Sequence, residues 1–169
     1  MTQSLILVDP RDRQIGTGEK MDVHRKGLLH RCFSIVVYND RGEMLLQKRA
    51  ASKYHSGGLW TNTCCGHPLD GEDTAEAAHR RLFEEMGFDC PLKERLTFIY
   101  QADLDHGMKE HEFDHLFVGI FNGEPVPNPE EADGYRWVLP QTVLKEIEEA
   151  PDTYTVWSKI AFEKPGVLP

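Results

Sequence analysis

The sequence has little positive charge and no long apolar run. Its 169 residues include 19 Lys and Arg against 28 Asp and Glu, for a net charge of −9. Nucleic-acid-binding proteins usually carry a basic face, so we expect no nucleic-acid partner. No apolar stretch is long enough to span a membrane, and the N-terminal residues lack the basic leader and the length of a signal peptide. We therefore expect a cytoplasmic protein with no membrane partner.

Cysteine is scarce as well, and its placement argues against disulfides. The chain has four cysteines, of which Cys64 and Cys65 are neighbours. A chain of this size typically buries roughly 70% of its unfolded surface, so it can form a core without covalent cross-links. We expect all four cysteines to be reduced and residues 1–169 to form one domain.

Apolar and β-branched segments between turn signals predict a mixture of strands and helices. Strands are predicted at Ser4–Val8, Cys32–Tyr38, Glu43–Lys48, Leu96–Asp103 and Glu110–Phe121, with a short one ending at Trp137. The second and third of these flank a turn and form a predicted hairpin. Residues 50–73 and 122–133 are predicted loops, and helices are predicted at Pro140–Glu149 and near Thr153–Glu163. This order favours an α/β sandwich.

The helix predicted between Asp73 and Gly87 has the clearest end signals. Asp73 can cap its N-terminus, with Glu76 completing a capping box, and Gly87 can end it. Apolar residues recur at helical spacing and predict its buried stripe: Ala75, Ala78, Leu82 and Met86. Arg81 and Glu85 are one turn apart on one face, which by itself is typical of a solvated ion pair.

Histidines and carboxylates are spaced in a way that suits a metal site. His24, His30 and His67 lie in or beside predicted turns and strands, whereas Glu110 and Glu112 alternate along one predicted strand and so share a face. Neutral imidazoles and carboxylates bind Mn²⁺, Zn²⁺ or Fe²⁺, and five or six such ligands suit Mn²⁺ or Mg²⁺ better than Zn²⁺. Taken singly, each histidine also fits a surface position, and the two glutamates also fit a solvated sheet face.

The segment from Gly66 to Phe88 resembles the Nudix box. The residues in register with that motif are Gly66, Glu72, Arg80, Leu82, Glu84, Glu85, Gly87 and Phe88. The resemblance implies a Nudix-fold α/β/α sandwich with a mixed sheet. Arg81 stands where the box of the hydrolases has a Glu that helps to bind Mg²⁺ beside a diphosphate, which argues against ordinary pyrophosphate hydrolysis.

Further motifs make the chain similar to the type I isopentenyl diphosphate isomerases, a non-hydrolytic branch of the Nudix fold. They are Thr61-Asn62 with Cys65-Gly66-His67-Pro68, Arg80-Arg81, Tyr100, Glu110-x-Glu112 and Trp157. The resemblance implies reversible conversion of isopentenyl diphosphate to dimethylallyl diphosphate through a tertiary carbocation-like intermediate, in isoprenoid biosynthesis. It also implies a monomer or weak dimer whose partner is a small allylic or homoallylic diphosphate.

The same resemblance implies the roles of individual residues. Cys65 and Glu112 are expected to handle protons, with Tyr100 beside Glu112 and Trp157 shielding the cation. A thiol near a metal and cations can be a thiolate, and Cys64 is expected to be a small buried neighbour. The residues expected to grip the diphosphate are Lys20, Arg49, Lys53 and Arg81. The expected ligands of Mn²⁺ (or Zn²⁺ or Mg²⁺) are His24, His30, His67, Glu110 and Glu112. A second Mg²⁺, which would arrive with the substrate, is expected at Glu85 and the Cys65 carbonyl.

Two other functions stay open at this stage. One is a Nudix hydrolase acting on a nucleoside diphosphate derivative, against which Arg81 counts. The other is a binding module that a metal stabilises, which would unfold on chelation. The paired CxxC motifs typical of structural zinc are absent from the sequence.

Overall fold

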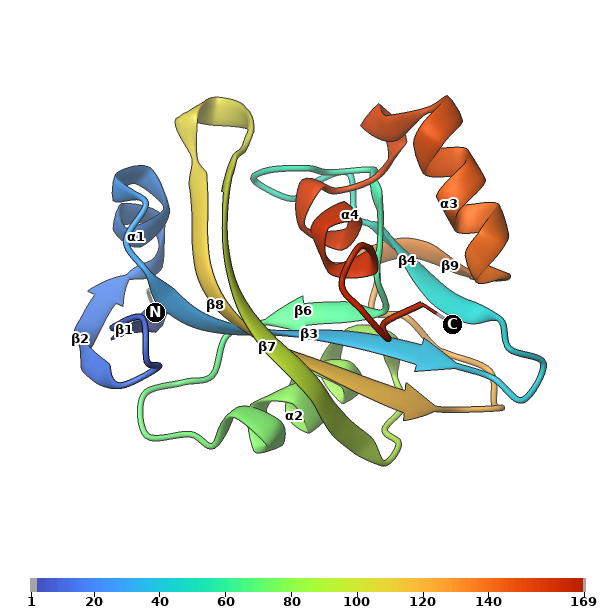
Figure 1. Cartoon of the computed structure of the whole chain (residues 1–169), viewed down its shortest axis with the longest axis horizontal. Coiled ribbons are helices and arrows are strands. Elements are labelled where there is room, and N and C mark those ends of the chain that lie inside the picture. Colours follow the sequence, from blue (N-terminus) through green and yellow to red (C-terminus); the bar gives the residue numbers. More distant parts are fainter. Residues whose placement is uncertain (1–2, 169) are drawn as a thin grey trace.

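The computed structural model describes residues 3–168, which form a nine-stranded mixed sheet with helices on both faces (Figure 1). The strands are β1 (Ser4–Val8), β2 (Gln14–Glu19), β3 (His30–Tyr38), β4 (Met44–Arg49), β5 (Trp60–Thr61), β6 (Cys64–Gly66), β7 (Leu92–Asp103), β8 (Lys109–Ile120) and β9 (Ala132–Val138). The helices are α1 (Lys20–Lys26), α2 (Thr74–Met86), α3 (Pro140–Glu149) and α4 (Val156–Phe162), with short 3₁₀ turns at Asp105–Gly107 and Pro151–Thr153.

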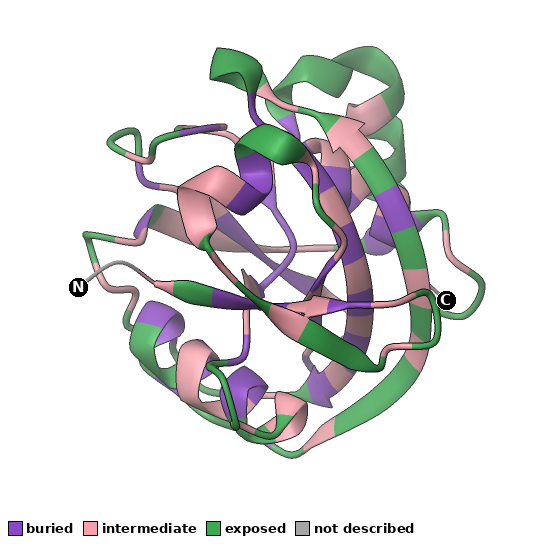
Figure 2. Cartoon of the chain, turned by 90° about the vertical axis from the view of Figure 1, so that its left-hand side faces the viewer, coloured by how far each residue is buried: buried purple, intermediate pink, exposed green. Residues whose placement is uncertain are grey.

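Strand β3 is buried on both faces and separates two hydrophobic clusters. Phe33, Ile35 and Val37 point to one side, where they pack with the buried face of α2. Val36 points to the other side, into a cluster that includes Phe162 of α4 and residues of α3. Figure 2 shows the buried residues gathered in the middle strands and the exposed ones on helices and outer loops. This arrangement is the predicted α/β/α sandwich.

Most predicted elements are confirmed with shifts at their ends. The strand Ser4–Val8 and the helix Pro140–Glu149 have the predicted bounds, and the long hairpin of β7 and β8 forms around a polar turn. In α2 the Asp73 side chain accepts hydrogen bonds from the N–H groups of Ala75 and Glu76, and Gly87 ends the helix at φ 73°, a conformation that favours glycine. The buried stripe includes Ala77, whereas the predicted Ala75 is only partly buried.

The prediction that β3 and β4 form a hairpin is wrong except for the turn that connects them. These strands share only the pair Tyr38 and Met44, because β6 pairs with β3 through Cys65 opposite Ser34 and β4 pairs mainly with β9. Both β5 and β6 lie inside residues 50–73, which were predicted as loop. The inserted strand β6 is what brings the segment of Cys65 into the sheet.

The elements β2 and α1 were not predicted, and α1 carries part of the site. Gly16 and Gly18 give β2 little strand character, and α1 has only seven residues. Glu19 caps α1, and Gly27 ends it at φ 62°. The helix packs against β8. It lies beside the first residue of β3, His30, which is opposite Glu112. Within residues 3–168, no helix has both the length and the apolar character needed to cross a membrane.

Candidate active site

A cavity of about 290 Å³ opens between α1, β6, the C-terminal half of α2 and the loop after β4. The predicted site residues that line it are Lys20, His24, Arg49, Lys53, Cys65, His67, Arg81, Glu85, Tyr100, Glu110, Glu112 and Trp157. His30 lies behind this wall, fully buried, and contacts Glu112. The cavity therefore gathers residues from seven segments of the chain.

Backbone hydrogen bonds fix the rings of two buried histidines. His24 Nδ1 lies 2.7 Å from the carbonyl oxygen of Lys20, and His30 Nδ1 lies 2.8 Å from that of Leu28. Because a carbonyl only accepts, each Nδ1 carries a proton, so in the neutral ring each Nε2 has the lone pair. Neither Nε2 has a hydrogen-bond partner among residues 3–168. This is the tautomer that metal-bound histidines adopt.

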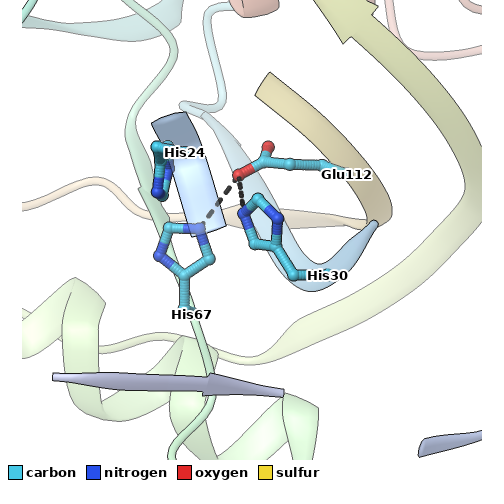
Figure 3. Close-up of side chains that lie close together, drawn as sticks. All are labelled: His24, His30, His67 and Glu112. Atoms are coloured by element: carbon cyan, nitrogen blue, oxygen red, sulfur yellow. Dashed lines mark hydrogen bonds and ion pairs between the residues drawn. The ribbon is translucent and has the colours of Figure 1, made fainter. Parts of the chain in front are cut away.

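Glu112 is the centre of the histidine group. Its Oε1 lies 2.9 Å from His67 Nε2 and 3.2 Å from His30 Nε2 (Figure 3), while its Oε2 accepts a hydrogen bond from the Tyr100 hydroxyl. Burial of this carboxyl opposes its ionisation, but the hydrogen-bonded ring of His67 and the adjacent ring of His30 outweigh that effect and hold the pKa of Glu112 well below its ordinary value. The structure thus keeps Glu112 as a carboxylate.

Glu110 lies at the edge of this group. Its Oε2 is 3.4 Å from His24 Nε2, is buried, and has no hydrogen-bond partner among the described residues. Burial and the neighbouring charge of Glu112 raise the pKa of Glu110 to about 7. A nearby cation would offset both effects.

The donor set fits a divalent metal ion. One ligand atom each from His24, His30, His67 and Glu112 lies within 4.8 Å of all the others, and burial lowers the pKa of His67 to about 3, so its imidazole is neutral. Buried polar atoms without partners are rare in proteins. A cation would satisfy the free Nε2 atoms of His24 and His30 and the free oxygen of Glu110.

The Cys65 sulfur is surrounded by neutral polar groups. Asn62 contacts it through both atoms of its amide, and the Ser34 hydroxyl lies 3.6 Å away. Ser34 in turn donates to Asp114, a fully buried carboxyl. Burial and the charge of Asp114 raise the pKa of the Cys65 thiol well above its ordinary value. The protein's own groups therefore favour the protonated thiol, and a thiolate beside a bound metal stays a prediction. Cys64 is fully buried, as predicted.

Two of the predicted diphosphate-binding cations, Lys53 and Arg81, are held by carboxylates. Glu131 forms an ion pair with Lys53, and its second oxygen lies 3.1 Å from Arg81 Nη2. The same Nη2 lies 2.5 Å from Glu85 Oε1. Gln47 donates to the other oxygen of Glu85 at 3.0 Å. Arg81 and Glu85 thus form a pair inside the cavity and are not a solvated surface pair.

Trp157 forms the wall of the cavity opposite α1. It is 6% exposed; the Arg49 guanidinium lies 5.0 Å from its ring centroid and the His55 ring 5.6 Å, edge-on. Burial and the charge of Arg49 lower the pKa of His55 to about 3, so its ring is uncharged. Beside them, the Lys20 ammonium lies 5.5 Å from the Tyr54 ring centroid.

Among the residues that sequence reasoning missed, Glu131 and His55 line this cavity, and Gln47 bonds Glu85. Glu131 lies in an acidic, Pro-rich segment, and nothing in its spacing sets it apart from Glu130. Gln47 occupies a buried strand position where an apolar residue is expected. His55 is one of eight histidines and shares no motif with the others. Only the pairing of β4 with its neighbours brings these side chains to the site.

Comparisons with known proteins agree with this geometry. The NUDIX domain model matches residues 28–157. The Isopentenyl-diphosphate Delta-isomerase 2 of Photorhabdus laumondii is 55% identical over 159 residues, covering 94% of this chain and 90% of that protein. The Isopentenyl-diphosphate Delta-isomerase of Serratia proteamaculans is 52% identical, covering 93% and 88%.

Solved structures agree on the fold. The crystal structure of DR0079 from Deinococcus radiodurans has a TM-score of 0.77 at 18% identity and covers 94% of this chain and 96% of that one. The MutT protein from Methanosarcina mazei has a TM-score of 0.65 at 19% identity, with coverage of 80% and 91%. At these identities the likeness concerns the fold alone.

Proposed function

Because the chain belongs to the Nudix family and, within it, to the isopentenyl-diphosphate Delta-isomerases, we propose that it converts isopentenyl diphosphate to dimethylallyl diphosphate. One observation carries the proposal most strongly: Cys65 and Glu112, two groups able to exchange protons, line the same cavity as four cationic side chains. A hydrolase needs an activated water at the diphosphate. This cavity instead offers two proton-transfer groups together with the cations, as a reaction on the hydrocarbon end of a diphosphate requires.

The reaction moves a double bond by exchanging two protons. A proton adds to the terminal alkene carbon, whose π electrons form the new C–H bond and leave a tertiary carbocation-like centre. A proton is then lost on the other side of that centre, from the carbon next to the CH₂–O unit that bears the diphosphate. The electron pair of this C–H bond forms the new double bond. We assign these transfers to Cys65 and Glu112, with the two roles exchanged in the reverse direction. Tyr100, bonded to Glu112 Oε2, can hold or pass the proton.

A carbocation in contact with water would be trapped as an alcohol, so the site must exclude water. Trp157 closes one wall, and its ring face can stabilise positive charge by about 0.5–2 kcal/mol. Enzymes typically lower their barriers by at least roughly 8 kcal/mol. Trp157 therefore assists, and most of the rate comes from the placement of the acid and the base.

The polar end of the cavity suits a diphosphate. We assign its binding to Lys20, Arg49, Lys53 and Arg81, which line the cavity and would pair with phosphate oxygens. We assign His24, His30, His67, Glu110 and Glu112 to one divalent ion, and Mn²⁺ is our choice because the set mixes imidazoles with carboxylates. When bound, this ion would hold Glu112 in place and lower the proton affinity of its carboxyl. Glu85 and the Cys65 carbonyl would hold a Mg²⁺ that enters with the diphosphate.

We place the enzyme in the cytoplasm as a single isomerase domain that is a monomer or weak dimer. The four cysteines, Cys32, Cys64, Cys65 and Cys90, are all free, in keeping with a reducing compartment.

An incubation in heavy water tests the activity. Wild-type protein should convert isopentenyl diphosphate to dimethylallyl diphosphate with deuterium in the new methyl group and without release of phosphate. Cys65→Ala and Glu112→Gln should each abolish net conversion, because each removes one proton-handling group. Cys65→Ala should keep its metal, whereas Glu112→Gln should lose part of it. Phosphate release by the wild type, with an unmoved and unlabelled alkene, would restore the hydrolase.

A further inference from the structure

The Asn62 side chain contacts the Cys65 sulfur through both polar atoms of its amide. Asn62 is fully buried; its Nδ2 lies 3.1 Å from Cys65 Sγ and its Oδ1 lies 3.2 Å from the same atom. The amide oxygen can therefore accept the S–H, while the amide nitrogen lies in contact with the same sulfur. The Ser34 hydroxyl, the other hydrogen-bonding side chain at this sulfur among the described residues, is farther away at 3.6 Å.

The orientation of the Asn62 amide is fixed by its other partners. Nδ2 donates to the backbone carbonyls of Ile35 at 3.0 Å and Cys64 at 2.9 Å. Oδ1 accepts the hydroxyl proton of Thr61 at 2.9 Å. A flipped amide would place its oxygen against two carbonyl oxygens and leave the Thr61 hydroxyl without its acceptor. The partners of the amide therefore determine that Oδ1 is the atom placed to accept the S–H of Cys65.

Buried hydroxyl groups connect Asn62 to α4, the helix that contains Trp157. The Thr155 hydroxyl lies 3.0 Å from that of Thr61 and 2.9 Å from that of Ser158. Thr155 is the N-cap of α4, and its N–H donates to the Trp60 carbonyl at 2.9 Å. Thr155 and Ser158 are both 0% exposed. The helix that holds the aromatic wall and the loop that holds the thiol therefore share one hydrogen-bonded network.

We propose that Asn62 is a positioning residue that fixes the Cys65 sulfur and the direction of its S–H bond, and that Thr61 and Thr155 hold Asn62 in the required orientation. The inference rests on the proposed function, in which Cys65 exchanges a proton with a substrate carbon. Such a transfer depends on the angle at which the S–H bond meets the carbon, and a misplacement of about 1 Å can cost about a hundredfold in rate. A thiol on a freely rotating Cα–Cβ bond would lose that alignment.

Three variants test the proposal by turnover and binding. Asn62→Ala should lower kcat by about a hundredfold while the affinity for inorganic pyrophosphate and the content of bound metal stay at the wild-type level. Thr61→Val keeps the amide but removes the hydroxyl that orients its oxygen, so kcat should fall by up to about tenfold. Thr63→Val is the matched control: its hydroxyl is equally buried and bonds Val37 N–H and the Leu45 carbonyl, yet it does not contact Cys65. This control should lower stability and leave kcat unchanged.

Infrared spectroscopy gives a readout that does not depend on turnover. The S–H stretching band of Cys65, isolated by subtracting the spectrum of Cys65→Ala, should move to higher wavenumber in Thr61→Val because the S–H···Oδ1 bond weakens. If Asn62→Ala does not fold, Thr61→Val still decides the matter. An unmoved band in Thr61→Val, or an equal loss of kcat in Thr63→Val, overturns the proposal. If the band shifts in Thr61→Val but the wild-type protein has no isomerase activity, the contact between Asn62 and the thiol is supported and the proposed function is refuted.

Discussion

Glu131 is the carboxylate whose removal gives the sharpest test of the electrostatics of the cavity. It pairs with Lys53 and with Arg81 Nη2, both of which we assign to the diphosphate. Without a ligand, this carboxylate forms ion pairs with cations that the diphosphate would otherwise bind. The change Glu131→Gln keeps the shape of the side chain and removes its charge, so we expect tighter binding of inorganic pyrophosphate.

The structure sets the size of the effect. A cation lies between the carboxylate and the ligand, and with charge-assisted hydrogen bonds of about 2.7–2.9 Å on each side the two anions are roughly 7 Å apart. A ligand with about three negative charges at that distance is repelled by about 1.8 kcal/mol in water. Screening at 0.1 M salt roughly halves this figure. Affinity should therefore rise by about fivefold at 0.1 M salt and by up to about twentyfold at low salt.

Titration calorimetry with inorganic pyrophosphate, without divalent metal and at two salt concentrations, measures this effect. Glu130→Gln is the matched control, because Glu130 is an exposed neighbour and the variant has the same net charge. Its affinity should change by less than about twofold, since charges exposed to solvent and beyond the cavity are largely screened. Unchanged or weaker binding by Glu131→Gln would refute the reasoning and would mean that Glu131 aligns the cations rather than competing for them.

Three other changes test the remaining assignments. His67→Ala should lower bound divalent metal to well under one equivalent by elemental analysis, and full occupancy would contradict its role as a ligand. Glu85→Gln should spare that metal and weaken the magnesium-dependent binding of an unreactive diphosphate analogue, and unchanged binding would remove Glu85 from the second metal site. Leu82→Ala should lower the free energy of unfolding by about 2–5 kcal/mol in urea titrations, because Leu82 is fully buried against β3; a loss below about 1 kcal/mol would contradict that packing.

The fold was predictable where local signals agree with tertiary packing. The helix after Asp73 has a cap, an apolar stripe and a terminal glycine, and the structure contains it from Thr74 to Met86. By contrast, β2 and α1 are short and are stabilised mainly by their neighbours: β2 by its pairing with β1, and α1 by its packing on β8. Periodicity cannot reveal an element whose stability comes from contacts with distant segments.

The site was predictable as a set of residues, through the family motifs, but its electrostatics were not. Nothing in the sequence says that Cys65 lies beside Asn62 and Ser34 instead of beside cations. Those contacts exist because β6 pairs with β3, which sets Cys65 opposite Ser34. The burial that follows favours the protonated thiol. A motif can specify which side chain is present, whereas its protonation state depends on the surroundings that the fold supplies.

Arg81 shows how one replacement changes the chemistry that this fold supports. Its Nη2 contacts Glu85 and Glu131 at once, so a Glu at this position would bring three carboxylates together. Such a group would attract metal ions and raise the pKa of at least one carboxyl, an arrangement suited to activating water at a phosphate. With Arg, the same position neutralises two carboxylates and adds a cation for the diphosphate. In the proposed function the phosphate end then binds without being attacked, and the proton exchange that we assign to Cys65 and Glu112 acts on the hydrocarbon end.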